Sequence, residues 1–224
     1  MLFIGRYMVD QKSKILGDVA EYYSERLKKF GATAKGVDWN DPKGQFLRFE
    51  QLGKLWLNSK SHADVISIAD YGCGYGAFLD YIRGSFPKDI DYEFLGLDVS
   101  ADMIEASRQR WQDDNKSRFL VGNQPDKKTD FAVASGIFNV SLGADHGDWL
   151  NYILETLRTM AEFSNKGFAF NCLTSYSDED RKADHLFYTD PCFIFDYCKS
   201  NFSRNVALLH DYDLYEFTIL VRHK

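Results

Sequence analysis

The sequence predicts an α/β fold in which a doubly wound sheet of seven strands follows an N-terminal helical cap. Strands alternate with helices from about residue 64 onwards, and a glycine-rich turn joins the first strand to the helix after it. Alternating strands and helices imply a mostly parallel sheet with helices on both faces. Two strands near the end of the chain are separated only by a short turn, which requires an antiparallel pair. The last strand is therefore expected to run against the others.

The helical cap is expected over residues 1–60, and the domain that carries the sheet over residues 61–224. Apolar side chains within residues 15–30 recur at helical spacing, and Gly31 is a typical stop signal. The polar segment 31–44 is expected to be a loop. A second amphipathic helix is expected after it, with one apolar side formed by Phe46, Phe49, Leu52, Leu55 and Trp56.

The predicted strands are short runs of apolar, β-branched and aromatic residues. In chain order they are expected at residues 65–69, 92–97, 119–121, 131–134, 168–173, 206–210 and 215–221. Helices are expected between them, beginning near Phe78, over residues 101–111 with Ser100 as the N-cap, and over residues 149–163.

Composition and charge narrow the functional classes. The chain has 224 residues, of which 45% are hydrophobic and 27% charged, as is typical of one globular domain. Its formal net charge of -6 disfavours a nucleic-acid partner, because affinity for phosphate backbones comes mainly from Lys and Arg. The sequence contains no apolar run of about 18 residues, and residues 1–5 are too short for a signal-peptide core. A cytoplasmic protein without a membrane partner is expected.

The cysteines are expected to be reduced thiols. Cys73, Cys172, Cys192 and Cys198 are scattered and lack the spacing of metal ligands, so no metal site is expected. Cys73 lies within the glycine-rich turn, where a small residue that fits a tight turn is favoured over a nucleophile.

The glycine-rich turn at residues 70–76, D-Y-G-C-G-Y-G, is the sharpest local feature. Its glycines can turn the chain, admit a ligand close to the backbone and let the helix pack on the strand. Gly72, Gly74 and Ala77 also satisfy the pattern of dinucleotide-binding turns. Asp70 favours a different ligand, because a carboxylate repels pyrophosphate but attracts the ammonium and sulfonium groups of S-adenosylmethionine.

Asp98 is the second candidate for ligand binding. It ends the second predicted strand, where a carboxylate can accept hydrogen bonds from both hydroxyls of a ribose. Dinucleotides and S-adenosylmethionine both contain that ribose, so Asp98 predicts a nucleoside site without choosing between them.

Four ordered segments give the chain a family resemblance. They are D-Y-G-C-G-Y-G at 70–76, G-L-D-V-S-A-D-M-I-E-A at 96–106, R-F-L-V-G-N at 118–123 and A-S-G-I-F-N at 134–139. From about residue 65 onwards, the sequence resembles the Rossmann-like class I methyltransferases, which use S-adenosylmethionine. The stretches at 22–40 and 204–217 resemble a bacterial group of such proteins with no established substrate.

The resemblance implies a cofactor site built from the loops after the first four strands. The matched residues are Asp70, Gly72, Cys73, Gly74, Gly76, Asp98, Val99, Met103, Gly122, Asn123, Ser135, Gly136 and Ile137. The glycine-rich turn would line the methionine end, Asp98 would hold the ribose, and Val99 and Met103 would contact the adenine. Residues 135–137 would form a wall near the sulfonium. Asn123 stands where family members often have Asp, and its amide carbonyl can still accept a hydrogen bond from the adenine amino group.

A small molecule is the expected methyl acceptor, and a protein side chain is the alternative. The acidic balance argues against nucleic acid, and residues 135–138, S-G-I-F, replace the Asn/Asp-Pro-Pro-aromatic motif of methyltransferases that act on base amino groups. An acceptor that loses a proton needs a base, and His146 and His185 are candidates in loops after the fourth and fifth strands. An exposed loop histidine with no role is favoured for each. Arg48 is interpreted either as a ligand of the cofactor carboxylate or, preferably, as an exposed helix arginine.

Aromatic residues are unusually frequent, at 16% of the chain. Tyr22, Tyr23, Trp39, Phe187 and Tyr188 can roof a small acceptor pocket, although core packing explains most aromatic residues equally well.

Two other functions remain open at this stage. The turn that begins at Gly72 is compatible with an NAD(P)-dependent oxidoreductase. A non-catalytic, cofactor-binding regulatory module would keep the same turn. The sequence does not indicate the oligomeric state.

Overall fold

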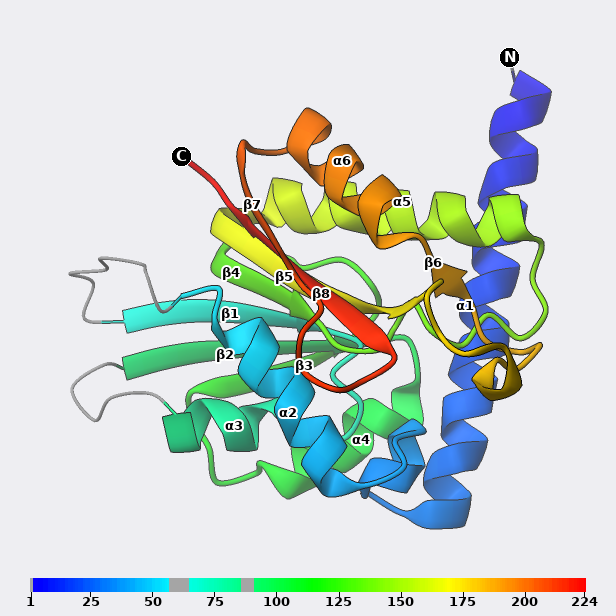
Figure 1. Ribbon diagram of the computed structural model, residues 1–224. Helices are drawn as coiled ribbons and strands as arrows, with labels where there is room; N and C mark the ends of the chain where they lie inside the picture. Colours follow the sequence, from blue (N-terminus) through cyan, green and yellow to red (C-terminus); the bar gives the residue numbers. More distant parts are fainter. Residues whose placement is uncertain (1, 57–64, 86–90) are drawn as a thin grey trace.

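The computed structural model describes residues 2–56, 65–85 and 91–224, with side chains from residue 13 onwards. Its strands form one sheet in the order β3-β2-β1-β4-β5-β8-β7, and a short β6 pairs with β5 beside this path (Figure 1). The strands are β1 (Val65–Tyr71), β2 (Asp91–Asp98), β3 (Ser117–Val121), β4 (Thr129–Ala134), β5 (Ser164–Thr174), β6 (Tyr188–Thr189), β7 (Asn205–Leu209) and β8 (Glu216–Arg222).

The pairing confirms the predicted doubly wound sheet with its antiparallel last strand. Strands β1 to β5 pair in parallel, whereas β8 runs antiparallel to both β5 and β7. The seven strands of the main path correspond to the seven predicted strands. Strand β6 was not predicted, because two residues are too short to show an alternating pattern. The strand order reverses between β1 and β4, and ligands of such sheets bind outside this switch point.

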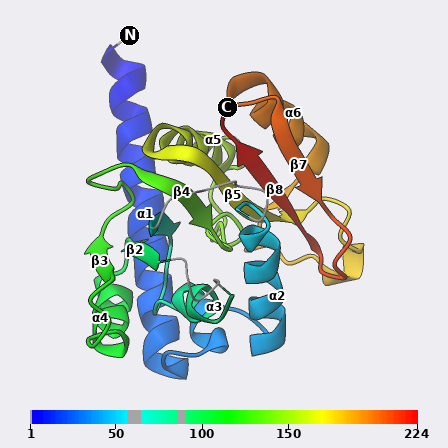
Figure 2. The ribbon, with the colours of Figure 1, turned by 90° about the vertical axis from the view of Figure 1, so that its left-hand side faces the viewer.

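Helices cover both faces of the sheet (Figure 2). They are α1 (Leu2–Phe30), α2 (Pro42–Gly53), α3 (Phe78–Ser85), α4 (Ala101–Arg110), α5 (His146–Phe163) and α6 (Pro191–Asn201), with two short 3-10 helices, η1 (Ala34–Val37) and η2 (Glu179–Arg181). One hydrophobic cluster joins the sheet to α5 and α6, and a second joins it to α2, α3 and α4. Helix α1 runs past the carboxyl ends of the parallel strands and contacts α4 and α5 (Figure 1).

The two N-terminal helices pack on opposite clusters. Ile15 of α1 belongs to the α5 cluster, whereas Phe49 and Leu52 of α2 belong to the cluster that contains Phe78. The division of the chain near residue 60 stays a prediction, and that boundary lies outside the described residues.

Helix ends follow the capping residues. Ser100 caps α4 as predicted and accepts a hydrogen bond from the N–H of Met103 (3.2 Å). Asp41 caps α2 and accepts from the N–H of Gly44 (2.9 Å), so α2 begins within the segment that was expected to be a loop. Asp145 caps α5, which begins three residues earlier than the predicted Trp149.

None of the described helices is both long and apolar enough to cross a bilayer. In the described ranges, no three His, Cys, Asp or Glu side chains come together as a metal site.

Candidate active site

A pocket with an empty volume of about 910 Å³, open solvent included, lies at the carboxyl ends of β1, β2, β3 and β4. Every residue predicted for the cofactor lines this first pocket except Gly76. The loops after four different strands therefore meet at one place, as the resemblance implied.

The glycine-rich turn is held against the end of β2. The N–H groups of Gly72 and Cys73 both donate to the carbonyl oxygen of Leu97, at 2.7 and 2.9 Å. Gly72 has φ +71°, and a Cβ atom there would lie 2.1 Å from Cγ2 of Ile137. This position therefore requires glycine for both its backbone angle and its close contact.

Gly76 contributes to packing and does not line the first pocket. A Cβ atom on Gly76 would lie 2.7 Å from Nε1 of Trp111, which donates to the carbonyl oxygen of Gly76 (3.0 Å). Cys73 is buried, and burial raises the pKa of its thiol well above the ordinary value. A raised pKa suppresses the reactive thiolate, in agreement with a packing role for Cys73.

Asp70 is a buried carboxylic acid whose charge the fold leaves unpaired. Its side chain lines the first pocket, is 2% exposed, and receives no hydrogen bond from any described residue. Burial, together with the nearby charge of Asp98, raises the pKa of Asp70 well above its usual range. The hydroxyl oxygen of Ser135, another lining residue, is buried and also has no partner among the described residues. A ligand with a cationic group and a polar neighbour fits this wall.

Asp98 is fixed by the backbone around it. Its Oδ2 accepts from the N–H of Gly74 and its Oδ1 from the N–H of Ser100, both at 2.9 Å. Burial raises the pKa of Asp98 to about 6, and hydrogen bonds from backbone N–H groups limit the rise. A carboxylate has about four lone-pair directions, so further hydrogen bonds to a ligand are available.

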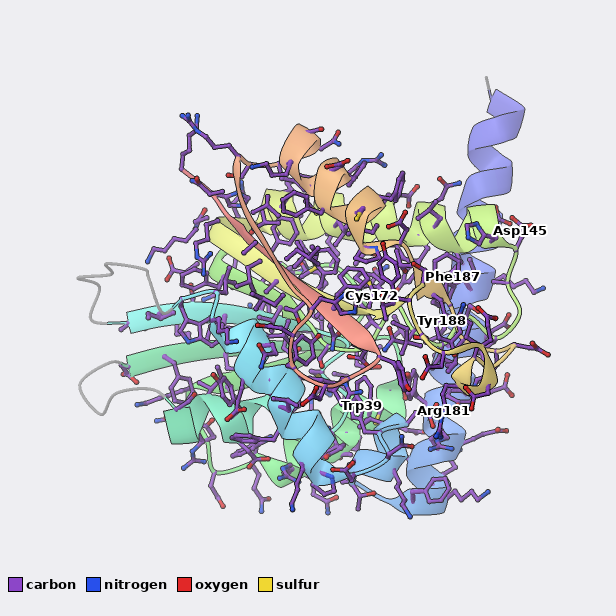
Figure 3. All side chains as sticks on the ribbon, viewed as in Figure 1. Trp39, Asp145, Cys172, Arg181, Phe187 and Tyr188 are labelled. Carbon is purple, nitrogen blue, oxygen red and sulfur yellow. The ribbon has the colours of Figure 1, made fainter. Side chains whose placement is uncertain are left out.

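Trp39 and Gly136 close the first pocket on the side of β4. Gly136 has φ +79°, its N–H donates to Oδ1 of Asn171 (2.7 Å), and a Cβ atom on it would lie 2.4 Å from Cζ2 of Trp39. The guanidinium carbon of Arg48 lies 4.0 Å from the centre of the Trp39 ring. Trp39 lies next to α2 and the turn before β8 (Figure 3). The indole is therefore fixed between the backbone of one loop and a side chain of α2.

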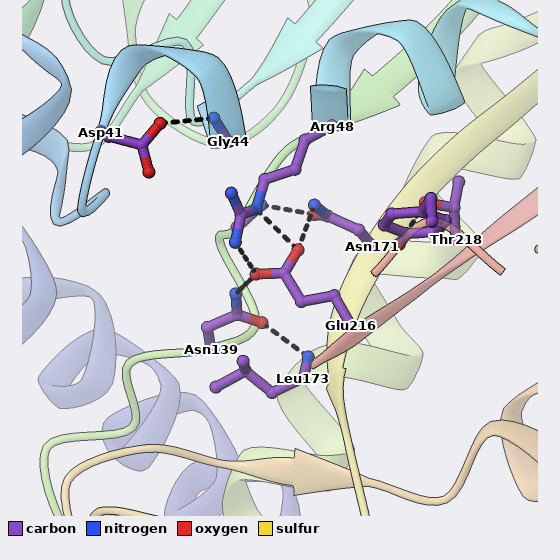
Figure 4. Close-up of polar contacts among 10 residues, drawn as sticks. Asp41, Gly44, Arg48, Asn139, Asn171, Leu173, Glu216 and Thr218 are labelled. Atoms are coloured by element: carbon purple, nitrogen blue, oxygen red, sulfur yellow. Dashed lines mark hydrogen bonds and ion pairs between the residues drawn. The ribbon is translucent and has the colours of Figure 1, made fainter. Parts of the chain in front are cut away.

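Arg48 pairs with Glu216 and does not line the first pocket (Figure 4). Its Nε and Nη2 donate to the two carboxylate oxygens of Glu216, each at 2.8 Å. Asn171 and Asn139 also donate to that carboxylate, at 2.8 and 3.4 Å. The side chains of Arg48 and Glu216 are 12% and 1% exposed. Arg48 is therefore neither an exposed helix arginine nor a residue of the first pocket, so both interpretations are wrong. The sequence pattern did not reveal its partner on β8.

Comparison with known proteins shows which family the chain belongs to. A family model described as "Methyltransferase domain" matches residues 69–162, which include the glycine-rich turn. A Mycobacterium tuberculosis protein, Rv1506c, whose curated name assigns it provisionally as a methyltransferase, is 48% identical over 160 residues. This match covers 71% of the present chain and 95% of the relative.

The chain belongs to this methyltransferase family.

Solved structures resemble this methyltransferase in fold. A complex described as DhpI with SAM and HEP has a TM-score of 0.62 at 12% identity, covering 93% of this chain and 97% of the other. The magnesium protoporphyrin IX methyltransferase of Synechocystis PCC 6803, solved with bound SAH, has a TM-score of 0.59 at 12% identity, covering 80% and 85%. The prediction of a class I, S-adenosylmethionine-dependent methyltransferase is confirmed at the level of family and fold.

Several residues that line the first pocket of the methyltransferase were missed by sequence reasoning. Tyr152 and Thr156 come from one face of α5, and Val19 comes from the face of α1 that also carries Tyr23, which was among the residues predicted to roof a pocket. Each pair has the four-residue spacing of an amphipathic helix, which does not distinguish a pocket wall from a core.

The structure separates the two candidate histidines. His146 is the first residue of α5, packs on Phe187 with ring centres 4.8 Å apart, and lines neither the first pocket nor its neighbour. His185 lines a second pocket that adjoins the first, with an empty volume of about 870 Å³. Trp39 and Gly136 line both pockets and mark the place where they meet.

Proposed function

We propose that this methyltransferase binds S-adenosylmethionine in the first pocket and transfers its methyl group to a small-molecule acceptor. The unpaired, buried carboxyl group of Asp70 carries the proposal. A carboxylate in that environment is stabilised by a cation, and the ammonium group of the cofactor supplies one. The structural neighbours described as complexes with SAM or SAH support the same ligand.

The remaining wall suits the other parts of the cofactor. Asp98, already oriented by two backbone N–H groups, would accept hydrogen bonds from the ribose hydroxyls. Val99 and Met103 would contact the adenine, and the amide of Asn123 would bind its amino group. The buried hydroxyl of Ser135, next to Gly136, would gain its missing hydrogen-bond partner from the cofactor.

The chain promotes the reaction mainly by orientation. When bound, S-adenosylmethionine supplies a methyl group on a sulfonium, which is already activated for in-line displacement. Trp39, Tyr23 and Tyr152 line the pocket and limit the access of water. Correct alignment of two reactants contributes up to about 7 to 11 kcal/mol, so the chain needs few groups that act chemically.

A small-molecule acceptor is supported by the second pocket and by charge. The second pocket adjoins the first, and Tyr23, Trp39 and Gly136 line both. The formal net charge of -6 disfavours binding to nucleic acid. Asp70 would lie close to the pyrophosphate of an NAD(P) cofactor, whose charge it repels.

Calorimetric titration with S-adenosylhomocysteine and, separately, with NADP tests the cofactor assignment. We expect heat of binding from S-adenosylhomocysteine and none from NADP. Binding of NADP alone would contradict the proposal. The methyl-transfer step is tested by incubating the protein with candidate acceptors. A coupling enzyme releases homocysteine from the product S-adenosylhomocysteine, and the homocysteine is measured. A cofactor-binding module without activity gives no homocysteine.

A further inference from the structure

The second pocket has its own chemical character. It is lined by the segment before α2, by the loops after β4 and β5, and by the turn before β8. It shares Tyr23, Val37, Trp39 and Gly136 with the first pocket. A molecule in the second pocket therefore lies next to the proposed cofactor.

The charged groups of the second pocket nearly cancel. Arg48 is neutralised by Glu216, and Asp38 is neutralised by Arg26 at 2.6 Å. Tyr22 also donates to Asp38, at 2.7 Å. Asp41 remains, but it is exposed, so water screens its charge, and one of its carboxylate oxygens caps α2. No cation in the described part of this pocket lacks a carboxylate partner.

Unused hydrogen-bonding groups line the same space. Nη1 of Arg48 donates to no described acceptor, because Nε and Nη2 make the contacts with Glu216. Oδ2 of Asp41 and the side-chain amide of Asn40 have no partner among the described residues. A ligand that carries both donors and acceptors, but no net charge, matches these groups.

We propose that the second pocket binds the methyl acceptor, that this acceptor is an uncharged, hydroxyl-rich compound such as a sugar or polyol, and that His185 accepts its proton. The proposal rests on the methyltransferase function proposed above. A hydroxyl is both donor and acceptor, so it can bond to Nη1 of Arg48 and to Asp41 at once. A phosphate or carboxylate meets Asp41 and finds Arg48 already paired, which disfavours it.

Methyl transfer to a hydroxyl group releases a proton, and His185 accepts it. A bond forms between the hydroxyl oxygen and the methyl carbon while the methyl–sulfur bond breaks and its electron pair stays on sulfur. The hydroxyl proton passes to an imidazole nitrogen of His185 and then to water. Among the described residues, His185 is the histidine that lines the second pocket. A positioned base of this kind contributes about 10²–10⁴ to the rate.

Methyl transfer into separated metabolite pools tests the acceptor class. A filtered small-molecule extract of the organism that produces the protein is divided by ion exchange into neutral, anionic and cationic pools. Each pool is incubated with the enzyme and S-adenosylmethionine labelled in its methyl group. We expect label in the neutral pool. Label confined to a charged pool overturns this inference but leaves the methyltransferase function intact.

The same assay separates failure of this inference from failure of the proposed function. No label in any pool, with S-adenosylhomocysteine still bound, contradicts both methyl transfer to a small molecule and the acceptor pocket. Absence of S-adenosylhomocysteine binding contradicts the proposed cofactor site itself.

Variants test the pocket and the base on the pool that accepts label. Leu214→Trp fills the second pocket from a residue that does not line the first, so we expect kcat/KM to fall at least about tenfold with unchanged affinity for S-adenosylhomocysteine. His185→Asn should lower kcat about 10²–10⁴-fold with unchanged affinity for S-adenosylhomocysteine. The matched control His146→Asn should behave as wild type. Unchanged kinetics of Leu214→Trp would place the acceptor elsewhere, and unchanged kinetics of His185→Asn would remove its role as base.

Discussion

The charge of Asp98 adds to the effect of burial in raising the pKa of Asp70, although the two residues lie near the carboxyl ends of different strands of the sheet. Strands β1 and β2 are parallel neighbours, so their carboxyl ends bring both side chains to the first pocket. Two buried carboxyl groups at one wall disfavour the folded protein when both are ionised. The site is therefore built for a ligand at some cost to the stability of the ligand-free protein.

Asp70→Asn should stabilise the ligand-free protein at neutral pH. Because the folded-state pKa of Asp70 is raised, the wild type loses stability as pH rises through that pKa, whereas the amide does not titrate. Each kcal/mol gained raises Tm by about 2 to 4 °C in a protein of this size. Thermal unfolding should show the gain at about pH 8 and its disappearance at about pH 4. The exposed control Asp113→Asn should show no such gain, and a less stable Asp70→Asn protein at about pH 8 would contradict this account.

Affinity for S-adenosylhomocysteine should fall as the pH falls below about 6. The ionised forms of Asp70 and Asp98 are proposed to bind the ligand, and burial raises both pKa values, that of Asp98 to about 6. Below those pKa values each protonation weakens binding by up to about tenfold per pH unit. Calorimetry between about pH 5 and about pH 8, in buffers of different ionisation enthalpy, measures the affinity and the protons released. Constant affinity over that range is the contrary outcome.

Gly136→Ala should destabilise the protein and weaken catalysis together. The new Cβ would meet Trp39 at 2.4 Å, and a positive φ costs alanine about 1–2 kcal/mol. Displacement of the indole opens the boundary between the two pockets. Thermal unfolding measures the loss of stability. The loss of activity is measured as homocysteine released by a coupling enzyme from the product S-adenosylhomocysteine. Gly84→Ala, an exposed α3 position with open space around it, is the control and should be stabilised by up to about 1 kcal/mol. Equal behaviour of the two variants would count against this reading.

The Arg48–Glu216 pair should show strong coupling in unfolding experiments. Removing one member leaves a buried charge, which costs about 3–5 kcal/mol, whereas removing both leaves none. Urea unfolding of Arg48→Met, Glu216→Leu and the double variant gives the coupling energy. We expect the double variant to be more stable than either single variant. Additive losses would mean that the pair does not act as a unit.

Local patterns predicted most of the fold. The glycine-rich turn, Asp98 and the cap Ser100 each depend on a few neighbouring residues, and the structure has each where the sequence indicated. Seven strands could likewise be placed from apolar runs and from the short turn before β8. These features were accessible because their determinants lie close together in the chain.

Contacts between distant segments could not be predicted in the same way. The partner of Arg48 is on the last strand, and Trp39 is fixed by Gly136 and Arg48 from two different elements. Tyr152 belongs to an amphipathic helix whose apolar face is continuous with the core. Such residues reach a pocket only through tertiary packing, and one sequence carries no signal for that packing.

The most direct test of the cofactor site compares two ligands on two proteins. S-adenosylhomocysteine and 5′-methylthioadenosine share the adenosine and the sulfur, but only the first carries the amino-acid end with its ammonium group. If Asp70 binds that group, the wild type should prefer S-adenosylhomocysteine by about tenfold or more, since a charge-assisted hydrogen bond contributes about 1.5–3 kcal/mol. Calorimetry should show that Asp70→Asn loses most of this preference while it retains affinity for 5′-methylthioadenosine. An equal preference in wild type and variant would contradict the central claim.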